Sequence, residues 1–353
     1  MIGFTTEIMK KFIILLLFMA LSIYSTRACT AFVLKKSNKN ILAKNLDWTT
    51  GQGFVIVNMP NIHRTALPFN NRIPLEWKSQ YSSITFNLLG KGLPLGGINE
   101  HGLVIEELNF TPSEYSTRNR FSLNEFEWIQ YHLDKCKNVE EVLVSCDTID
   151  IVPLLSRLHY LVCDASGHVA VIEFIQGEIK IYQGNDLIVP VLTNNSYSNS
   201  LKYLGFHQGF GGNRSVSRGT ESPERFVRAA TLVMNYTISP KSSIIGKAFN
   251  ILDSVKQDDT QWRIVYDILD KKIIFQTKQN PMRDTLDFNL ISLKYPGQIM
   301  FINCDECGRN SHQFEKYTEK KNQLLIESVF EKLVDAEELS RSRADQLMLK
   351  LSR

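Results

Sequence analysis

The sequence predicts an α+β fold in which antiparallel sheets are covered by helices. Short apolar segments separated by polar turns come in blocks, first between residues 30 and 110 and again between 158 and 193. Segments with apolar residues at helical spacing come in separate blocks, between 123 and 144 and between 224 and 255. Separate blocks of strands and helices favour antiparallel sheets, whereas a parallel βαβ fold alternates its strands and helices along the chain.

The first 28 residues have the layout of a secretion signal peptide. Two lysines precede the apolar run 12–24, and small residues flank an expected cleavage site before Cys29. The run is shorter than the ~20 residues that a membrane-spanning helix needs. We therefore expect an exported protein, periplasmic or secreted, with no stable membrane span after cleavage. An uncleaved anchor is an alternative, and so is a lipoprotein acylated on Cys29, although the charged Arg27 fits a lipoprotein signal poorly.

The mature chain is expected to begin with a β-hairpin formed by residues 30–34 and 41–46 around the polar turn 37–40. Further strands are predicted at 54–59, within 77–89, from 103 onward, and at 158–164, 169–174, 179–182, 188–193, 264–267 and 272–276. We interpret residues 96–102 as a turn, because they contain three glycines and an asparagine.

Helices are predicted wherever the apolar spacing changes to that of a helix. These segments are 123–133, 139–144, 224–234 and 242–255. The charged, amphipathic segment 324–351 is expected to form a surface helix near the end of the chain.

Charge argues against nucleic acid as a partner. The net charge is +3, and removal of the predicted leader leaves about +1. A nucleic-acid-binding protein normally carries a strongly basic surface. We therefore expect no nucleic-acid partner.

Cysteine usage does not indicate a disulfide scaffold. Five cysteines follow Cys29, an odd number that is sparse for the length: Cys136, Cys146, Cys163, Cys304 and Cys307. Cys304 and Cys307 resemble half a zinc site or a redox pair, but a zinc site needs four ligands. In an exported protein, a local disulfide or two free thiols is the preferred interpretation.

Cys29 is the most informative residue, because cleavage before it would make it the first residue of the mature protein. Its thiol and its free α-amine would then supply a nucleophile and a base on one residue. An α-amine has a reference pKa of ~7.7–8.0, so it can accept a proton near neutral pH. The arrangement predicts nucleophilic catalysis without a catalytic histidine.

Five separated segments resemble the choloylglycine hydrolases, which include bile salt hydrolases and penicillin V acylases and belong to the N-terminal nucleophile (Ntn) hydrolases. The segments have the family's order and similar spacing, and they are 29–31, 44–48, 99–103 with 108–110, 192–194, and 224–228. The resemblance implies an Ntn-hydrolase αββα sandwich that requires no metal or organic cofactor. It also implies three parts: a signal peptide 1–28, a catalytic domain 29–310 and a charged helical tail 311–353.

The resemblance also implies a role for each matching residue. Cys29 would attack an amide carbonyl to form a thioester, and Asp47 would hold the nucleophile and its amine in position. Asn194 would donate its side-chain amide to the oxyanion, with the backbone N–H of Asn109 as the second donor. Arg225 would lie beside the cysteine and favour the thiolate.

Lys44 departs from the family's pattern, which usually has arginine at this position. A lysine preserves the positive charge near the thiol but loses the planar, bidentate geometry of a guanidinium. We expect a Lys44→Arg variant to retain or improve activity.

The implied activity is hydrolysis of a linear carbon–nitrogen amide bond in a small N-acyl compound with an apolar acyl part. Bile salts, penicillin V and N-acyl homoserine lactones are the family's substrates, and fatty-acyl amides are more distant ones. Candidate substrate-binding residues are Trp48, Phe54, Tyr81 and Phe110. Family members are often tetramers, so a homo-oligomer is possible. The alternative from another class is an exported lipoprotein or ligand-binding module with the same fold and no turnover.

Overall fold

The computed structural model describes residues 29–36, 39–69, 72–118, 121–236, 243–306 and 313–351. The predicted signal peptide and Cys307 lie outside these ranges. Cleavage before Cys29 and pairing of Cys304 with Cys307 therefore stay predictions. No helix of the described residues is both long enough and apolar enough to cross a membrane.

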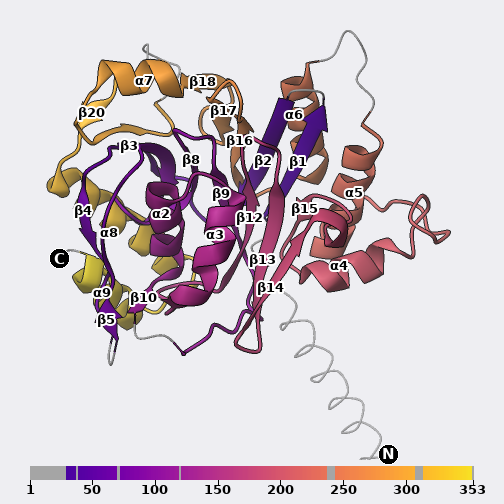
Figure 1. The fold of residues 1–353 in the computed structure, drawn as a ribbon, viewed down its shortest axis with the longest axis horizontal. Helices are drawn as coiled ribbons and strands as arrows, with labels where there is room; N and C mark the ends of the chain where they lie inside the picture. Colours follow the sequence, from indigo (N-terminus) through magenta and orange to yellow (C-terminus); the bar gives the residue numbers. More distant parts are fainter. Residues whose placement is uncertain are drawn as a thin grey trace, which may run out of the picture.

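Two large antiparallel sheets form the centre of the molecule (Figure 1). The first sheet has the order β15 (Val191–Leu192), β1 (Thr30–Lys36), β2 (Lys39–Asp47), β16 (Thr260–Asp267), β17 (Lys272–Thr277) and β18 (Asp284–Asp287). The second has the order β14 (Glu178–Gln183), β13 (Val169–Ile175), β12 (Leu158–Cys163), β9 (Val104–Asn109), β8 (Pro94–Asn99), β7 (Ser83–Asn87), β3 (Phe54–Asn58), β19 (Met300–Asn303) and β20 (Glu315–Lys316).

Helices cover the outer faces of both sheets, which gives the predicted helix–sheet–sheet–helix layering. On the first sheet, α5 (Ser222–Met234) and α6 (Ile244–Val255) pack against β1 and β2. On the second sheet, α2 (Glu125–Lys135) packs against β8 and β9, and α3 (Val139–Ser145) lies beside it (Figure 1). The α+β prediction is confirmed.

In the described part of the chain, four further helices and two small sheets lie outside the two large sheets and the helices that cover them. The helices are α4 (Tyr197–Leu204), α7 (Phe288–Lys294), α8 (Glu319–Asp335) and α9 (Arg341–Leu351). Two small sheets pair β4 (His63–Thr65) with β6 (Glu76–Lys78), and β10 (Phe121–Leu123) with β5 (Ile73–Pro74) and β11 (Asp150–Ile151).

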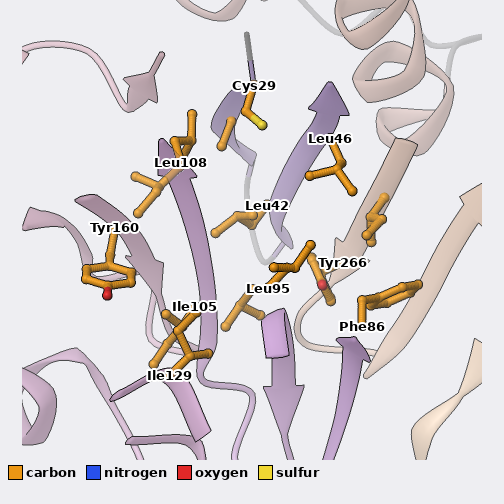
Figure 2. Close-up of a cluster of buried hydrophobic side chains, with 14 of the residues drawn as sticks. Cys29, Leu42, Leu46, Phe86, Leu95, Ile105, Leu108, Ile129, Tyr160 and Tyr266 are labelled. Atoms are coloured by element: carbon orange, nitrogen blue, oxygen red, sulfur yellow. The ribbon is translucent and has the colours of Figure 1, made fainter. Parts of the chain in front are cut away.

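The apolar core lies between the two sheets. Figure 2 shows Leu42 and Tyr266 of the first sheet next to Leu95, Ile105 and Leu108 of the second. All five side chains are nearly or fully buried, and each large apolar side chain contributes about 1.5–3 kcal/mol through its removal from water.

The interpretation of residues 96–102 as a turn is wrong in its first half. Gly96 and Gly97 belong to β8, and the turn begins only at Asn99, whose side-chain oxygen accepts hydrogen bonds from the backbone N–H groups of His101 and Leu103. A Cβ atom on Gly96 would lie 2.2 Å from a carboxylate oxygen of Glu106. The absence of a side chain at Gly96 leaves space for the side chain of Glu106, and the backbone of Gly96 continues the strand without turning.

Candidate active site

The pairing of β1 with β2 brings Cys29 next to Asp47. Ala31 lies opposite Lys44 and Thr30 opposite Asn45, so the same register carries Cys29 to the end of β2. The Cys29 Sγ lies 3.9 Å from the backbone oxygen of Asp47. Figure 2 shows Cys29 at one end of the apolar cluster, between Leu108 and Leu46.

The Cys29 thiol is buried and therefore protonated at neutral pH. Burial raises its pKa to about 12, while the charge of Lys44 opposes this rise. A thiol with such a pKa is a weak nucleophile until a base removes its proton. The site therefore needs a proton acceptor close to Cys29.

Asp47 has one carboxylate oxygen satisfied and one without a hydrogen bond. Oδ1 accepts a hydrogen bond from the hydroxyl of Thr260, and Oδ2 is buried with no partner among the described residues. Burial raises the Asp47 pKa to about 7, against the opposing effects of the Thr260 hydrogen bond and the charge of Arg225. A buried oxygen without a partner is costly, so this position is suited to an additional donor or cation.

Arg225 links Cys29 to Asn194. Nη1 donates to the backbone oxygen of Cys29 at 2.8 Å and to the hydroxyl of Thr30, and Nη2 donates to Oδ1 of Asn194 at 3.0 Å. Nε donates to the backbone oxygen of Thr220 at 3.0 Å. The side chain is fully buried, and burial lowers its pKa, but a guanidinium stays charged.

Asn194 and Asn109, the predicted oxyanion donors, lie side by side. The Nδ2 of Asn194 donates to the backbone oxygen of Asn109 at 2.9 Å, and a side-chain amide carries a second N–H. The 2.9 Å contact thus occupies one N–H of the Asn194 amide, and the second N–H is available to a substrate oxygen.

The backbone N–H of Asn109 points away from β12. The backbone N–H of Phe110 donates to the backbone oxygen of Arg157 at 2.7 Å, so the neighbouring Asn109–Leu158 pair is of the type that exchanges no hydrogen bonds. Leu158 accordingly uses its own N–H to bond the hydroxyl of Tyr115. The Asn109 N–H is directed toward the side of β8, which begins only at Pro94.

Lys44 is held by two carboxylates that the sequence analysis did not single out. Its Nζ lies 3.0 Å from a carboxylate oxygen of Glu106 and 3.0 Å from one of Glu107, and all three side chains are buried. Burial lowers the pKa of Lys44, but the two carboxylates outweigh it and the net pKa is raised. The hydroxyl of Tyr266 also donates to Glu106 at 2.5 Å.

This arrangement adds two carboxylates to the expected positive charge of Lys44. Its charge lowers the pKa of the Cys29 thiol, but Glu107 raises that pKa, so the positive potential is partly cancelled. Two adjacent glutamates in an otherwise apolar strand were the signal in the sequence, because buried carboxylates need a partner.

A cavity of about 1230 Å³ opens beside Asn194, Asn109 and Arg225. Phe110, one of the candidate substrate-binding residues, lines it together with Leu154, Leu155 and Ile175. The ring of Phe110 stacks on His159 at 4.8 Å between centroids, which fixes its orientation.

The other three candidates for substrate binding do not line this cavity. Tyr81 precedes β7 at the opposite end of the sheet from Asn109 and packs edge-on against His101. Phe54 is on the same edge as Asn109 but three strands away, or about 14 Å, and packs against Phe301. Trp48 is buried and donates its indole N–H to Glu338 at 3.0 Å. Of the four candidates, Phe110 is the one that lines this cavity, and a substrate-binding role for any of them stays a prediction.

The described residues contain no group of three or more histidine, cysteine, aspartate or glutamate side chains placed to hold a metal ion.

Comparison with known proteins relates this chain to amide hydrolases. The family model for linear amide C–N hydrolases, choloylglycine hydrolase family, matches residues 29–301. A curated penicillin V acylase from Pectobacterium atrosepticum is 28% identical over 243 residues. That match covers 63% of this chain and 63% of the relative, so the chain aligns with less than two thirds of the relative's length.

Two solved structures have the same fold. The penicillin V acylase from Agrobacterium tumefaciens superimposes with a TM-score of 0.68 at 24% identity, covering 82% of this chain and 98% of that one. A variant of the conjugated bile acid hydrolase from Clostridium perfringens gives 0.62 at 19% identity, with 82% and 97% covered. The prediction of an Ntn-hydrolase sandwich is thereby confirmed. Since the family model begins at Cys29 and spans most of the chain, the protein belongs to the choloylglycine hydrolase family of linear amide C–N hydrolases.

Proposed function

We propose that the mature chain begins at Cys29 and hydrolyses N-acyl amides through a thioester on this residue. The observation that carries the proposal is the contact of one buried guanidinium, that of Arg225, with both Cys29 and Asn194. It joins a nucleophile at the start of β1 to an amide donor at the rim of a large cavity. Asp47, whose backbone oxygen lies 3.9 Å from the Cys29 Sγ, has a buried side-chain oxygen without a hydrogen bond among the described residues, and we propose that this oxygen accepts from the free α-amine of Cys29.

The first half of the reaction uses both groups of Cys29. The α-amine takes the thiol proton, the sulfur forms a bond to the amide carbonyl carbon, and the carbonyl oxygen becomes an oxyanion. The second N–H of the Asn194 amide and the N–H of Asn109 stabilise that charge. The carbon–nitrogen bond then breaks, and the leaving amine takes the proton from the α-ammonium.

The second half regenerates the enzyme. Water attacks the thioester carbonyl while the α-amine accepts a proton from it, the carbon–sulfur bond breaks, the sulfur takes the proton back from the α-ammonium, and the carboxylic acid leaves. Asp47 stabilises the α-ammonium in both halves through its free oxygen. A carboxylate next to the amine raises the fraction of amine that carries the proton, and Arg225 limits this effect by its own charge.

The substrate class follows from the lining of the cavity. Phe110, Leu154, Leu155 and Ile175 provide apolar surface, so we propose that the acyl part is apolar. The two acylases and the bile acid hydrolase are named for penicillin V and for conjugated bile acids. These compounds are the first to test.

A lipoprotein or binding module is the competing function. Cys29 is only 3% exposed and leads directly into a core strand, whereas a lipid-bearing cysteine has to reach a membrane. This burial favours the enzyme. We further propose that the leader directs export, since the free α-amine requires its removal.

Two chains that differ only at the N-terminus test the mechanism. One begins at Cys29, and the other retains Arg27 and Ala28, so that its α-amine is displaced from the site. We expect the first to release amine from penicillin V or a glycine-conjugated bile acid and the second to be inactive while folding equally well. A Cys29→Ser variant should lose the thioester adduct in intact-mass spectra of the quenched reaction. Equal activity of both chains would exclude the α-amine as base, and binding of these compounds without turnover would support the binding module.

A further inference from the structure

We infer that Arg343, on the C-terminal helix α9, binds an anionic group on the amine part of the substrate. The inference rests on the proposed amide hydrolysis and adds a specificity residue to it. Arg343 lies outside residues 29–301, the part that the family model matches.

The C-terminal helix reaches the cavity that holds Asn194 and Arg225. Arg343 lines this cavity, and its Nη2 donates to the backbone oxygen of Leu154 at 3.1 Å. This contact joins residues 189 positions apart in the chain. The side chain itself is exposed, which places it at the rim of the cavity.

The segment 154–156, to which Arg343 donates its hydrogen bond, is itself held by a buried carboxylate. Leu154, Leu155 and Ser156 all donate their backbone N–H groups to the buried carboxylate of Glu125, at 2.6–2.8 Å. A loop with three N–H groups bound to one carboxylate has little freedom to move. Arg343 therefore bonds to a fixed point, which presents its guanidinium in a defined place.

The charge at the cavity favours an anion. Arginines 157, 225 and 343 line it, and Glu221 is its one acidic lining residue among those the structure describes. Among the described residues, the Arg343 guanidinium forms no ion pair with a carboxylate. An arginine with spare N–H donors in a cationic rim is suited to a carboxylate, which it can bind with two parallel hydrogen bonds.

The order of the reaction assigns this anion to the amine part. After the first step the acyl part stays bonded to Cys29, while the amine has to leave for solvent. The amine part must therefore occupy the open side of the cavity, where Arg343 lies. We expect a substrate whose leaving amine carries a carboxylate.

Two substrate pairs test the inference on the chain that begins at Cys29: penicillin V with its methyl ester, and a glycine-conjugated bile acid with the matching glycinamide. We expect Arg343→Gln to raise KM about twofold to fivefold for the acid, the range of an exposed charge pair, with kcat within about twofold. KM for the neutral partner should not change. Arg343→Lys should recover part of the loss, and Arg341→Gln, an exposed charge on the same helix, should have no effect on either substrate.

The outcomes separate this inference from the proposed function. Turnover by the wild type with an equal effect of Arg343→Gln on acid and neutral partner would overturn the inference, because it would indicate only support of the segment 154–156. Unchanged KM for both would overturn it too. Absence of wild-type turnover on every substrate would overturn the proposed function and the inference together. Thermal unfolding of each variant checks that the fold is retained.

Discussion

Arg225 and Cys29 are joined by a hydrogen bond of 2.8 Å although they lie 196 positions apart in the chain. The same guanidinium binds Oδ1 of Asn194, which turns the amide Nδ2 toward Asn109. One side chain thus fixes the position of the proposed nucleophile and the orientation of the proposed oxyanion donor. The Arg225 guanidinium makes four hydrogen bonds from three nitrogen atoms, Nε, Nη1 and Nη2, and the single ammonium nitrogen of a lysine cannot reproduce this arrangement.

Arg225→Lys should lower kcat by at least about 100-fold, similar to the loss of one oxyanion donor, because the Asn194 amide is then free to rotate. The measurement is steady-state kinetics on the chain that begins at Cys29. Arg228→Lys is the matched control, since Arg228 lies on the same helix and donates to the backbone of Ser217, Gly219 and Ser254 outside the site. An equal loss of kcat in both variants would contradict the role of Arg225.

Lys44→Met should destabilise the fold by about 3–5 kcal/mol, because it leaves the buried carboxylates of Glu106 and Glu107 without a cation. Urea unfolding measures the change. Lys44→Arg keeps the charge and should retain much of the stability and the activity, and Lys44→Met with Glu106→Gln should be more stable than Lys44→Met alone. If Lys44→Met is as stable as the wild type, the two carboxylates do not depend on this cation.

Stability should depend on pH through Asp47 in the chain that retains Arg27 and Ala28. Its pKa is raised to about 7 in the folded state, from an ordinary 3.8. Between these two pH values the carboxyl therefore binds more protons in the folded chain than in the unfolded chain. The contribution of Asp47 to the free energy of unfolding is therefore complete below about pH 4 and is lost as the pH rises through 7.

The difference in unfolding free energy between this chain and its Asp47→Asn variant should consequently fall between pH 4 and 7. Urea unfolding at several pH values measures it. Glu125 and Glu127, whose pKa values burial also raises to about 7, are present in both chains and cancel. A difference that grows with pH would mean that Asp47 is already ionised in the folded protein.

Glu338→Gln should loosen the segment that follows Asp47. Glu338 accepts hydrogen bonds from the Trp48 indole and the Thr49 hydroxyl, and thereby ties the turn between α8 and α9 to the end of β2. We expect a red shift of tryptophan fluorescence and a loss of about 1 kcal/mol, as for a typical hydrogen bond. Glu337→Gln, at the neighbouring exposed position, should change neither quantity.

Two glycine substitutions should have opposite signs. Gly96→Ala places a Cβ 2.2 Å from Glu106, so it should displace this carboxylate from Lys44 and lower stability by about 2 kcal/mol or more. Gly246→Ala lies in α6 with its nearest neighbour at 3.9 Å and should raise stability by about 0.5–1 kcal/mol through helix propensity. Thermal unfolding of both variants measures the signs, and stabilisation by Gly96→Ala would contradict the packing argument.

The sequence by itself determined the layers of this protein and the residues of its candidate site. Alternating and helical spacing are local properties, so the hairpin of β1 and β2 and the helices α2, α5 and α6 could be predicted closely. The five motifs pointed to Cys29, Asp47, Asn109, Asn194 and Arg225, which the structure brings together.

Tertiary structure alone decided what each site residue contacts. The pairing of Lys44 with Glu106, the space that Gly96 leaves, and the distance of Phe54 and Tyr81 from the cavity all depend on strand order and register, which place residues of different strands opposite one another. The approach of Arg343 to Leu154 likewise requires the docking of a helix after the family region ends. Local spacing fixes which face a residue occupies on its own element, but the neighbour on the opposing element follows only when the whole chain has packed.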